Sequence, residues 1–172
     1  TRGVLGEIQL GNILEEIMAP EQYETNVKTK KGSDAMVEYA VKLPGKGLDE
    51  KAVYLPIDAK FPQEDYLRLQ SAYDAGDSVA VEVSLKALLQ SVKKFAKDIS
   101  SKYIDPPNTT DFGIMFLPVE GLFAEVVRQP DMIAFLQREY KIVVTGPTTL
   151  AAMLNSLQMG FKTLAIQKRS SE

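Results

Sequence analysis

Hydrophobic positions recur along the chain with two periods, which predict both helices and strands. In residues 3–19, apolar side chains recur at spacings of three and four, as on one buried face of a helix, and Pro20 ends this pattern. Residues 23–29 and 36–43 alternate between apolar and polar positions, and the turn residues between them predict a hairpin. After a loop at 44–51, residues 52–60 predict a third strand, so the chain begins helix, strand, strand, strand.

The second half of the chain predicts helices that alternate with short buried strands. Residues 63–73 indicate a short helix, and residues 79–103 a long amphipathic helix. The continuous apolar runs at 112–117 and 141–145 suit central strands. Further helices are predicted over 118–140, with a break near Pro130, and from Pro147 to about Thr163. The order favours an α/β fold with a mixed central sheet, flanking helices and one long helix after the third strand.

The third predicted strand ends in an acid and a base, Asp58 and Lys60. Side chains alternate along a strand, so these two point the same way while Ile57 and Ala59 point into the core. A carboxylate and an ammonium group on an otherwise apolar strand end cost desolvation energy unless something uses them. For an Asp-x-Lys sequence alone, a surface salt bridge is the simpler interpretation.

Composition indicates a single soluble globular domain and excludes several kinds of chemistry. The chain has 172 residues, of which 45% are hydrophobic and 25% charged, with a net charge of −3. Affinity for nucleic acid would therefore require a local basic patch. The chain has no cysteine and no histidine, which excludes thiolate nucleophiles, Ser-His-Asp machinery and zinc sites of the usual kinds. Catalysis would depend on carboxylates, lysines, hydroxyls and a hard metal ion.

Other sequence signals concern the extent of the protein. No glycine-rich phosphate-binding loop, signal peptide or membrane-spanning apolar run occurs in the sequence. No internal repeat or second domain is indicated, so we expect one domain at residues 1–168 and a frayed tail at residues 169–172. The chain begins at Thr1 rather than Met, and we expect it to be a fragment of a longer protein.

Four residues form a candidate catalytic set, Glu7, Glu38, Asp58 and Lys60. Glu7 leans toward the apolar face of the first predicted helix, where a partly buried carboxylate with a local partner is the alternative. Carboxylates on adjacent strands can converge on Mg²⁺ or Mn²⁺, which lowers the pKa of bound water and balances charge on a phosphodiester. A neighbouring lysine can position that water. The set and its order resemble the PD-(D/E)xK nuclease core.

A wider resemblance runs from Arg2 to about Lys168. Short blocks along the chain resemble the conserved domain of the DNA recombination protein RmuC family. Their order and spacing carry the resemblance: Arg2-Gly3-x-x-Gly6-Glu7-x-x-Leu10, Ile13-Leu14-Glu15, Tyr23-Glu24-Thr25, Leu43-Pro44, Ile57-Asp58-Ala59-Lys60, Met115-Phe116-Leu117-Pro118-Val119-Glu120 and Pro147-Thr148-Thr149-Leu150.

The resemblance implies a restriction-endonuclease-like fold that acts on DNA during recombination, with recombination or repair proteins as further partners. It also implies a full-length protein with an N-terminal membrane anchor or a coiled coil through which it oligomerises. The present domain would lie in the cytoplasm without membrane contact, while the inner membrane holds the anchor. Glu7 matches the family's helix acid, and Asp58 and Lys60 match its Asp-x-Lys. Glu38 replaces the aspartate of a family Pro-Asp.

Basic residues on the long predicted helix are candidates for nucleic-acid contact. Lys86, Lys93 and Lys97 fall on one side, with Lys94 and Lys102 nearby, and they could form a phosphate-contacting ridge. A solvated helix face is the alternative.

Three functions remain open from the sequence. The first is a Mg²⁺-dependent or Mn²⁺-dependent deoxyribonuclease in which Glu38 and Asp58 bind the cation, Glu7 supports them or holds a second ion, and Lys60 lies beside the attacking water. The second is a nuclease-like fold that binds DNA or a recombination partner without cutting. The third is an assembly domain carried on a coiled coil.

Overall fold

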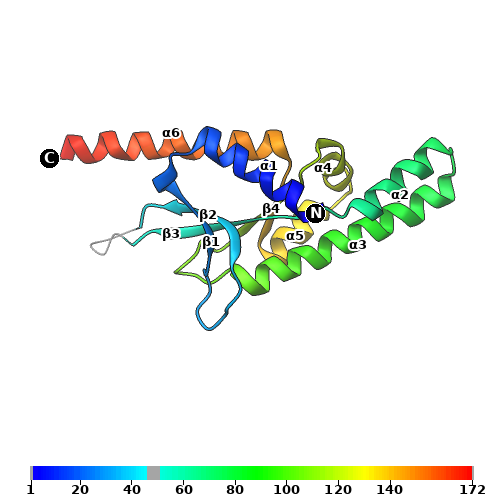
Figure 1. Ribbon diagram of the computed structural model, residues 1–172, viewed down its shortest axis with the longest axis horizontal. Coiled ribbons are helices and arrows are strands. Elements are labelled where there is room, and N and C mark those ends of the chain that lie inside the picture. Colours follow the sequence, from blue (N-terminus) through cyan, green and yellow to red (C-terminus); the bar gives the residue numbers. More distant parts are fainter. Residues whose placement is uncertain (1, 46–50, 172) are drawn as a thin grey trace.

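The alternating segments form a five-stranded mixed sheet, as predicted (Figure 1). The computed structural model of the protein describes residues 2–45 and 51–171; the predicted loop at 44–51 falls largely outside them. Strand order follows chain order, with β1 to β3 antiparallel and β3 to β5 parallel. The strands are β1 (Tyr23–Val27), β2 (Val37–Leu43), β3 (Val53–Ala59), β4 (Gly113–Phe116) and β5 (Ile142–Thr145).

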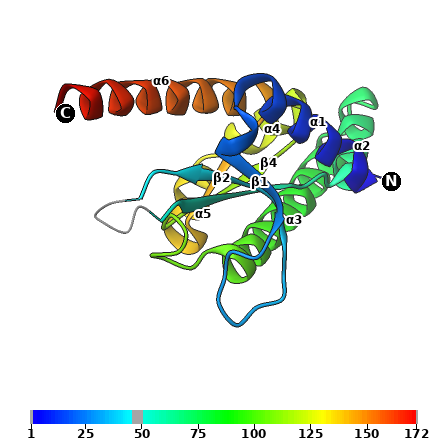
Figure 2. The same cartoon turned by 60° about the vertical axis from the view of Figure 1, so that its left-hand side comes forward.

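The helices also lie close to their predicted positions. Pro130 lies between two separate helices, which confirms the predicted break. The predicted end of the last helix is wrong, because the helix continues eight residues past Thr163 and includes most of the predicted frayed tail. Its final turns project beyond the sheet (Figures 1 and 2). The helices are α1 (Arg2–Ile17), the short 3₁₀ helix η1 (Pro20–Gln22), α2 (Gln63–Asp74), α3 (Ser78–Tyr103), α4 (Glu120–Val127), α5 (Met132–Tyr140) and α6 (Pro147–Ser171).

Helices α1 and α6 cover one face of the sheet. Leu10 and Leu14 of α1 and Leu154 of α6 are fully buried against Ile57 and Phe116 of the sheet. This core confirms that Ile57 and Ala59 point inward from β3. The two helices are also joined by Gln158, whose amide donates 3.0 Å to the carbonyl oxygen of Ile17 at the end of α1.

Helices α3 and α5 pack against the opposite face, and α2 pairs with the first half of α3 in a helical hairpin that extends beyond the sheet (Figure 1). Leu88, Val92, Ala96 and Ile99 recur every three or four residues along α3 and are fully buried, which confirms its predicted apolar stripe. They pack in one cluster with residues of β4, α4 and α5. The sheet therefore has helices packed against both of its faces.

The tip of the β1–β2 hairpin is fastened to the C-terminal end of α3. The last carbonyl groups of a helix lack partners within the helix. Here the Thr29 hydroxyl donates 2.7 Å to the carbonyl oxygen of Tyr103, and Lys30 Nζ donates 2.7 Å to that of Ser101. The backbone N–H of Lys31 donates 3.0 Å to Asp105 just beyond α3. The hairpin thus supplies the missing donors and covers the C-terminal end of α3.

Within the described residues, no helix has the length and apolar character needed to cross a membrane. The finding agrees with the absence of a long apolar run in the sequence.

We predict that Thr29→Val destabilises the fold by about 1 to 3 kcal/mol, because it leaves a helix-end carbonyl without its donor at a fully buried position. Urea unfolding followed by circular dichroism measures the change. Thr25→Val on exposed β1 is the matched control and should change stability by less than about 0.5 kcal/mol. Equal effects of the two substitutions would show that the hydroxyl does not fasten the hairpin.

Candidate functional site

Strand pairing brings Glu38 and Asp58 together at one end of the sheet. Tyr39 of β2 pairs with Ile57 of β3, so in this antiparallel register the preceding residue of β2 lies across from the following residue of β3. Both carboxyl side chains lie on the sheet face opposite the Ile57 side chain. The same end of the sheet holds the ends of β1, β3, β4 and β5 and the start of β2.

Lys60 reaches back to the carboxylate two residues before it. Its Nζ lies 3.0 Å from Oδ2 of Asp58, whose side chain is only 4% exposed. The backbone N–H of Lys60 donates 2.9 Å to the carbonyl oxygen of Phe116, which continues the ladder one residue past β3. The ammonium group also lies 5.5 Å from the centre of the Phe95 ring on α3. The predicted shared direction of Asp58 and Lys60 is therefore confirmed, as an ion pair that is largely buried.

Glu38 carries the strongest electrostatic perturbation at this end of the sheet. Burial, a hydrogen bond to Asp58 and the negative charges of Asp58 and Glu7 raise the pKa of Glu38 from 4.5 to about 9, while the backbone N–H of Ala59 acts in the opposite direction. Glu38 therefore keeps its proton at neutral pH when no cation is bound.

The oxygen atoms of this pair suit a hard divalent cation. Glu38 Oε2 and Asp58 Oδ2 are buried and accept no hydrogen bond from the described residues, so the ion pair with Lys60 is the contact that holds Oδ2. Mg²⁺ and Mn²⁺ prefer oxygen ligands, and a cation between the two carboxyl groups would replace the proton on Glu38. Across residues 2–45 and 51–171, however, no three acidic side chains lie close enough together to hold a metal ion by themselves.

Glu7 lies near this pair without joining it. The prediction that Glu7 leans toward the apolar face of the helix is wrong, because its side chain is exposed. The buried positions of α1 are Gly6, Leu10 and Leu14, and Glu7 is one residue off that stripe. Gly6 lets α1 approach the end of β3, since a Cβ there would lie 3.4 Å from that of Ala59. This approach places Glu7 where its charge acts on Glu38.

The predicted lysine ridge on α3 lies on a different flank from the carboxylates. Lys93 stands over the Phe135 ring of α5, with Nζ 4.5 Å from the ring centre. Phe95, which touches Lys60, is two residues further along and therefore roughly 200° around the helix. Lys86 and Lys97 are exposed on the Lys93 side. The structure does not bring Lys86, Lys93 and Lys97 next to Asp58, and Lys94 points to solvent.

Two tyrosines that the sequence reasoning missed lie on the same side of the sheet. Burial and the negative charges of Asp58 and Glu38 raise the pKa of Tyr103 at the end of α3 to about 12. A hydrogen bond to Glu24 and burial raise the pKa of Tyr54 to about 12. The block Tyr23-Glu24-Thr25 signalled the strand that carries Glu24. No signal in the sequence links Tyr103 to strands 45 or more residues before it.

Two of the sequence blocks meet at the start of α6. The Thr148 backbone N–H donates 2.5 Å to the Glu120 carboxylate, and the Gly146 N–H donates 2.7 Å to the Thr149 hydroxyl. A carboxylate at a helix N-terminus satisfies a free N–H group and the helix dipole. Glu120 therefore has a structural role that joins α4 to α6.

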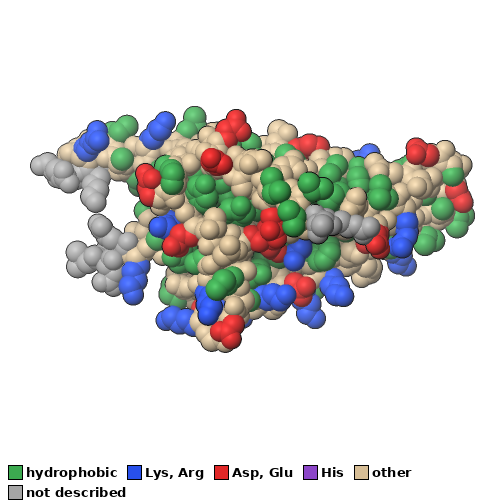
Figure 3. Space-filling view, viewed as in Figure 1, with side chains coloured by type: hydrophobic (Ala, Val, Ile, Leu, Met, Phe, Trp, Pro, Cys, Tyr) green, Lys and Arg blue, Asp and Glu red, His purple; other side chains and the backbone are tan. Residues whose placement is uncertain are grey.

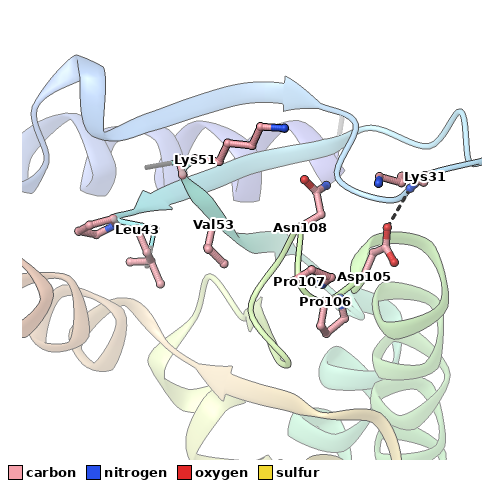
Figure 4. A pocket seen from close by; sticks show the side chains of 11 residues that line it. Lys31, Leu43, Lys51, Val53, Asp105, Pro106, Pro107 and Asn108 are labelled. Atoms are coloured by element: carbon pink, nitrogen blue, oxygen red, sulfur yellow. Dashed lines mark hydrogen bonds between the residues drawn. The ribbon is translucent and has the colours of Figure 1, made fainter. Parts of the chain in front are cut away.

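A pocket lies elsewhere, at the opposite end of β3 from Asp58. It has a volume of about 810 Å³ and lies between the hairpin, the start of β3 and the segment after α3. Figure 4 shows Lys31, Val53, Asp105 and Asn108 around it. This pocket and the candidate catalytic residues therefore lie at different ends of the sheet.

Comparisons with known proteins support the resemblance found in the sequence. The family described as the RmuC family matches residues 1–172. A DNA recombination protein RmuC homolog from Xylella fastidiosa is 52% identical over the whole chain, which spans 38% of that protein. A homolog from Pseudomonas aeruginosa is 30% identical over 90% of the chain and 34% of its own length. The Escherichia coli K12 DNA recombination protein RmuC is 30% identical over 91% of the chain and 33% of its own length. No solved structure matches the chain.

We predict that Glu38→Gln removes part of the pH dependence of stability in cation-free buffer. Between pH 4.5 and about 9 the folded state keeps a proton on Glu38 that the unfolded chain releases, so the free energy of unfolding of the wild type falls as pH rises. Glutamine does not titrate, so the free energy of unfolding of the variant lacks this decline. The difference in stability between variant and wild type therefore shifts in favour of the variant as pH rises. Urea unfolding at several pH values in EDTA measures it, with Glu15→Gln on exposed α1 as the control. Parallel profiles of wild type and Glu38→Gln would contradict the prediction.

Proposed function

The chain belongs to the RmuC family, and on this premise we propose that it acts on DNA in recombination as a metal-dependent nuclease. The observation that carries the proposal is the pair of carboxyl groups at one sheet end, Glu38 and Asp58, with Lys60 Nζ 3.0 Å from Asp58. A structural ion pair needs only one of these acids. A second carboxyl group that must stay protonated in the absence of a cation is costly for stability, and such groups are typical of functional sites.

The proposed roles follow from the position of each side chain. Glu38 and Asp58 hold Mg²⁺ or Mn²⁺, which would lower the pKa of a bound water and balance the charge on a phosphodiester. Lys60 orients the attacking water and stabilises negative charge on the phosphate as the phosphorus–oxygen bond breaks. Exposed Glu7 supports the site through its charge or through bridging water. Tyr103 lies close enough to the two carboxyl groups for their charges to raise its pKa, and it contributes a hydroxyl to this side of the sheet.

We further propose that the domain is a variant of the restriction-endonuclease-like fold. The mixed sheet, the acidic helix α1 before it and the order of carboxylates on β2 and β3 support this assignment. The long α3 after β3 supports it as well.

The alternative is a domain that holds DNA without cutting it. The observation in its favour is that the described residues provide two close acidic ligands rather than three. Cation binding without cleavage of linear, nicked or single-stranded DNA would select this alternative.

We predict that Asp58→Ala and Lys60→Ala each lower Mg²⁺-dependent or Mn²⁺-dependent DNA cleavage by about 100-fold or more, because each removes a group that acts on the charge of the transition state. Gel assays on linear, nicked and single-stranded DNA, with and without EDTA, measure the rates, and circular dichroism checks the fold. Asp34→Ala is the matched control, since this exposed hairpin acid lies outside the carboxyl pair. Full activity of either site variant would contradict the catalytic assignment.

We also predict that Mn²⁺ raises the melting temperature of the wild type and that this shift grows with pH from about 6 to 8, because the cation must displace the proton on Glu38. Asp58→Asn should abolish the shift and Asp34→Asn should retain it. Differential scanning calorimetry measures the shift without reference to cleavage. An undiminished shift in Asp58→Asn would place the cation elsewhere.

A further inference from the structure

The β1–β2 hairpin and the end of α3 are basic in a chain that is acidic overall. The hairpin loop, residues 28–36, contains three lysines and one aspartate, and residues 93–103 of α3 contain four lysines and one aspartate, against a net charge of −3 for the chain. Figure 3 shows basic side chains gathered along the lower edge, over the hairpin and α3, below acidic side chains in the middle of this face.

The hairpin runs from the carboxyl pair, at its base, to Lys31 at its tip, which lines the pocket at the start of β3. The hairpin leaves the sheet between the end of β1 and the start of β2, and the Val27–Val37 pair directly precedes Glu38. On α3, Lys102 follows Phe95 by seven residues, or about two turns, and shares the flank that faces Lys60. Tyr103, the next residue, lies close enough to feel the charges of Asp58 and Glu38.

Three of these lysines are available to a ligand. Lys28 has a side chain that is 51% exposed, with only the fully exposed Asp34 as its partner at 3.5 Å. The ammonium groups of Lys31 and Lys102 are exposed and have no ion pair among the described residues. Lys30 differs, because its Nζ caps the carbonyl oxygen of Ser101. The hydrogen bonds of Thr29 and Lys31 to the α3 end hold the set in place.

An acidic site that accepts a polyanion needs positive charge at its rim. Two carboxyl groups and Glu7 repel a phosphodiester, so most of the binding free energy must come from lysines that contact phosphates nearby. The ridge of Lys86, Lys93 and Lys97 does not meet this need, because Lys93 is engaged by Phe135 on the α5 flank.

We propose that the hairpin–α3 rim, defined as Lys28, Lys31 and Lys102, binds the sugar-phosphate backbone of DNA and holds it against the carboxyl pair. This inference rests on the proposed function in that DNA is the substrate, but it concerns binding and not cleavage. The contacts are to phosphates, so the rim binds DNA without regard to base sequence. The hairpin is the element that the backbone crosses.

The test is the salt dependence of binding to a short fluorescent DNA duplex, measured by anisotropy in EDTA so that no cleavage occurs. Each phosphate contact contributes about 0.9 to the slope of the logarithm of affinity against the logarithm of salt concentration. The triple variant Lys28→Gln, Lys31→Gln and Lys102→Gln should therefore have a slope shallower than the wild type by about 2 to 3 units. Lys30 is left intact so that the end of α3 stays capped.

A matched control removes three positive charges elsewhere, Arg68→Gln, Lys86→Gln and Lys162→Gln, all at exposed positions of α2, α3 and α6. Its slope should stay within about half a unit of the wild type, since it removes no phosphate contact. An unchanged slope in the rim variant, an equal loss in the control or no binding by the wild type would overturn the inference. The shift of the melting temperature by Mn²⁺ tests the carboxyl pair separately. Failure of the binding proposal is therefore distinguishable from failure of the proposed function.

Discussion

The cost of holding two carboxyl groups together away from water organises this end of the molecule. Glu38 and Asp58 are placed side by side by the antiparallel register of β2 and β3, which the apolar residues on the other face fix. The proton on Glu38, the ammonium group of Lys60 and the N–H of Ala59 offset the repulsion and the loss of solvation. Slipping the register by one residue would turn these acids into the opposite core, so sheet stability and site assembly depend on the same pairing.

Much of this arrangement could be predicted from residue patterns. The alternation of apolar and polar residues predicted the strands and the face on which the Asp58 and Lys60 side chains lie, because the two faces of a strand follow directly from its sequence. The position of Glu7 could not be predicted, since one residue separates it from the buried stripe of α1 and helix phase is uncertain at that precision. The full length of α6 was missed because polar residues suggested fraying, whereas the helix continues to Ser171.

Other features depend on contacts between segments far apart in the chain. The elevated pKa of Glu38 requires the cross-strand partner, and Tyr103 comes near the two acids because α3 packs against the sheet. The motif at Glu120 had the opposite outcome: a charged residue in a recognisable block binds the N-terminus of α6. Block-like sequence similarity therefore marks both the candidate chemistry and the joints that keep the strand ends aligned.

The bonds of Thr29 and Lys30 to the last turn of α3 have a mechanical consequence. A force on the hairpin tip is transmitted to the helix, and the same helix carries Tyr103 near the two acids and Phe95 under Lys60. The hairpin tip and the surroundings of Lys60 are thus connected through the single helix α3. Lifting the tip would break the hydrogen bonds at the last turn of α3, and this turn also carries Tyr103 near the two acids.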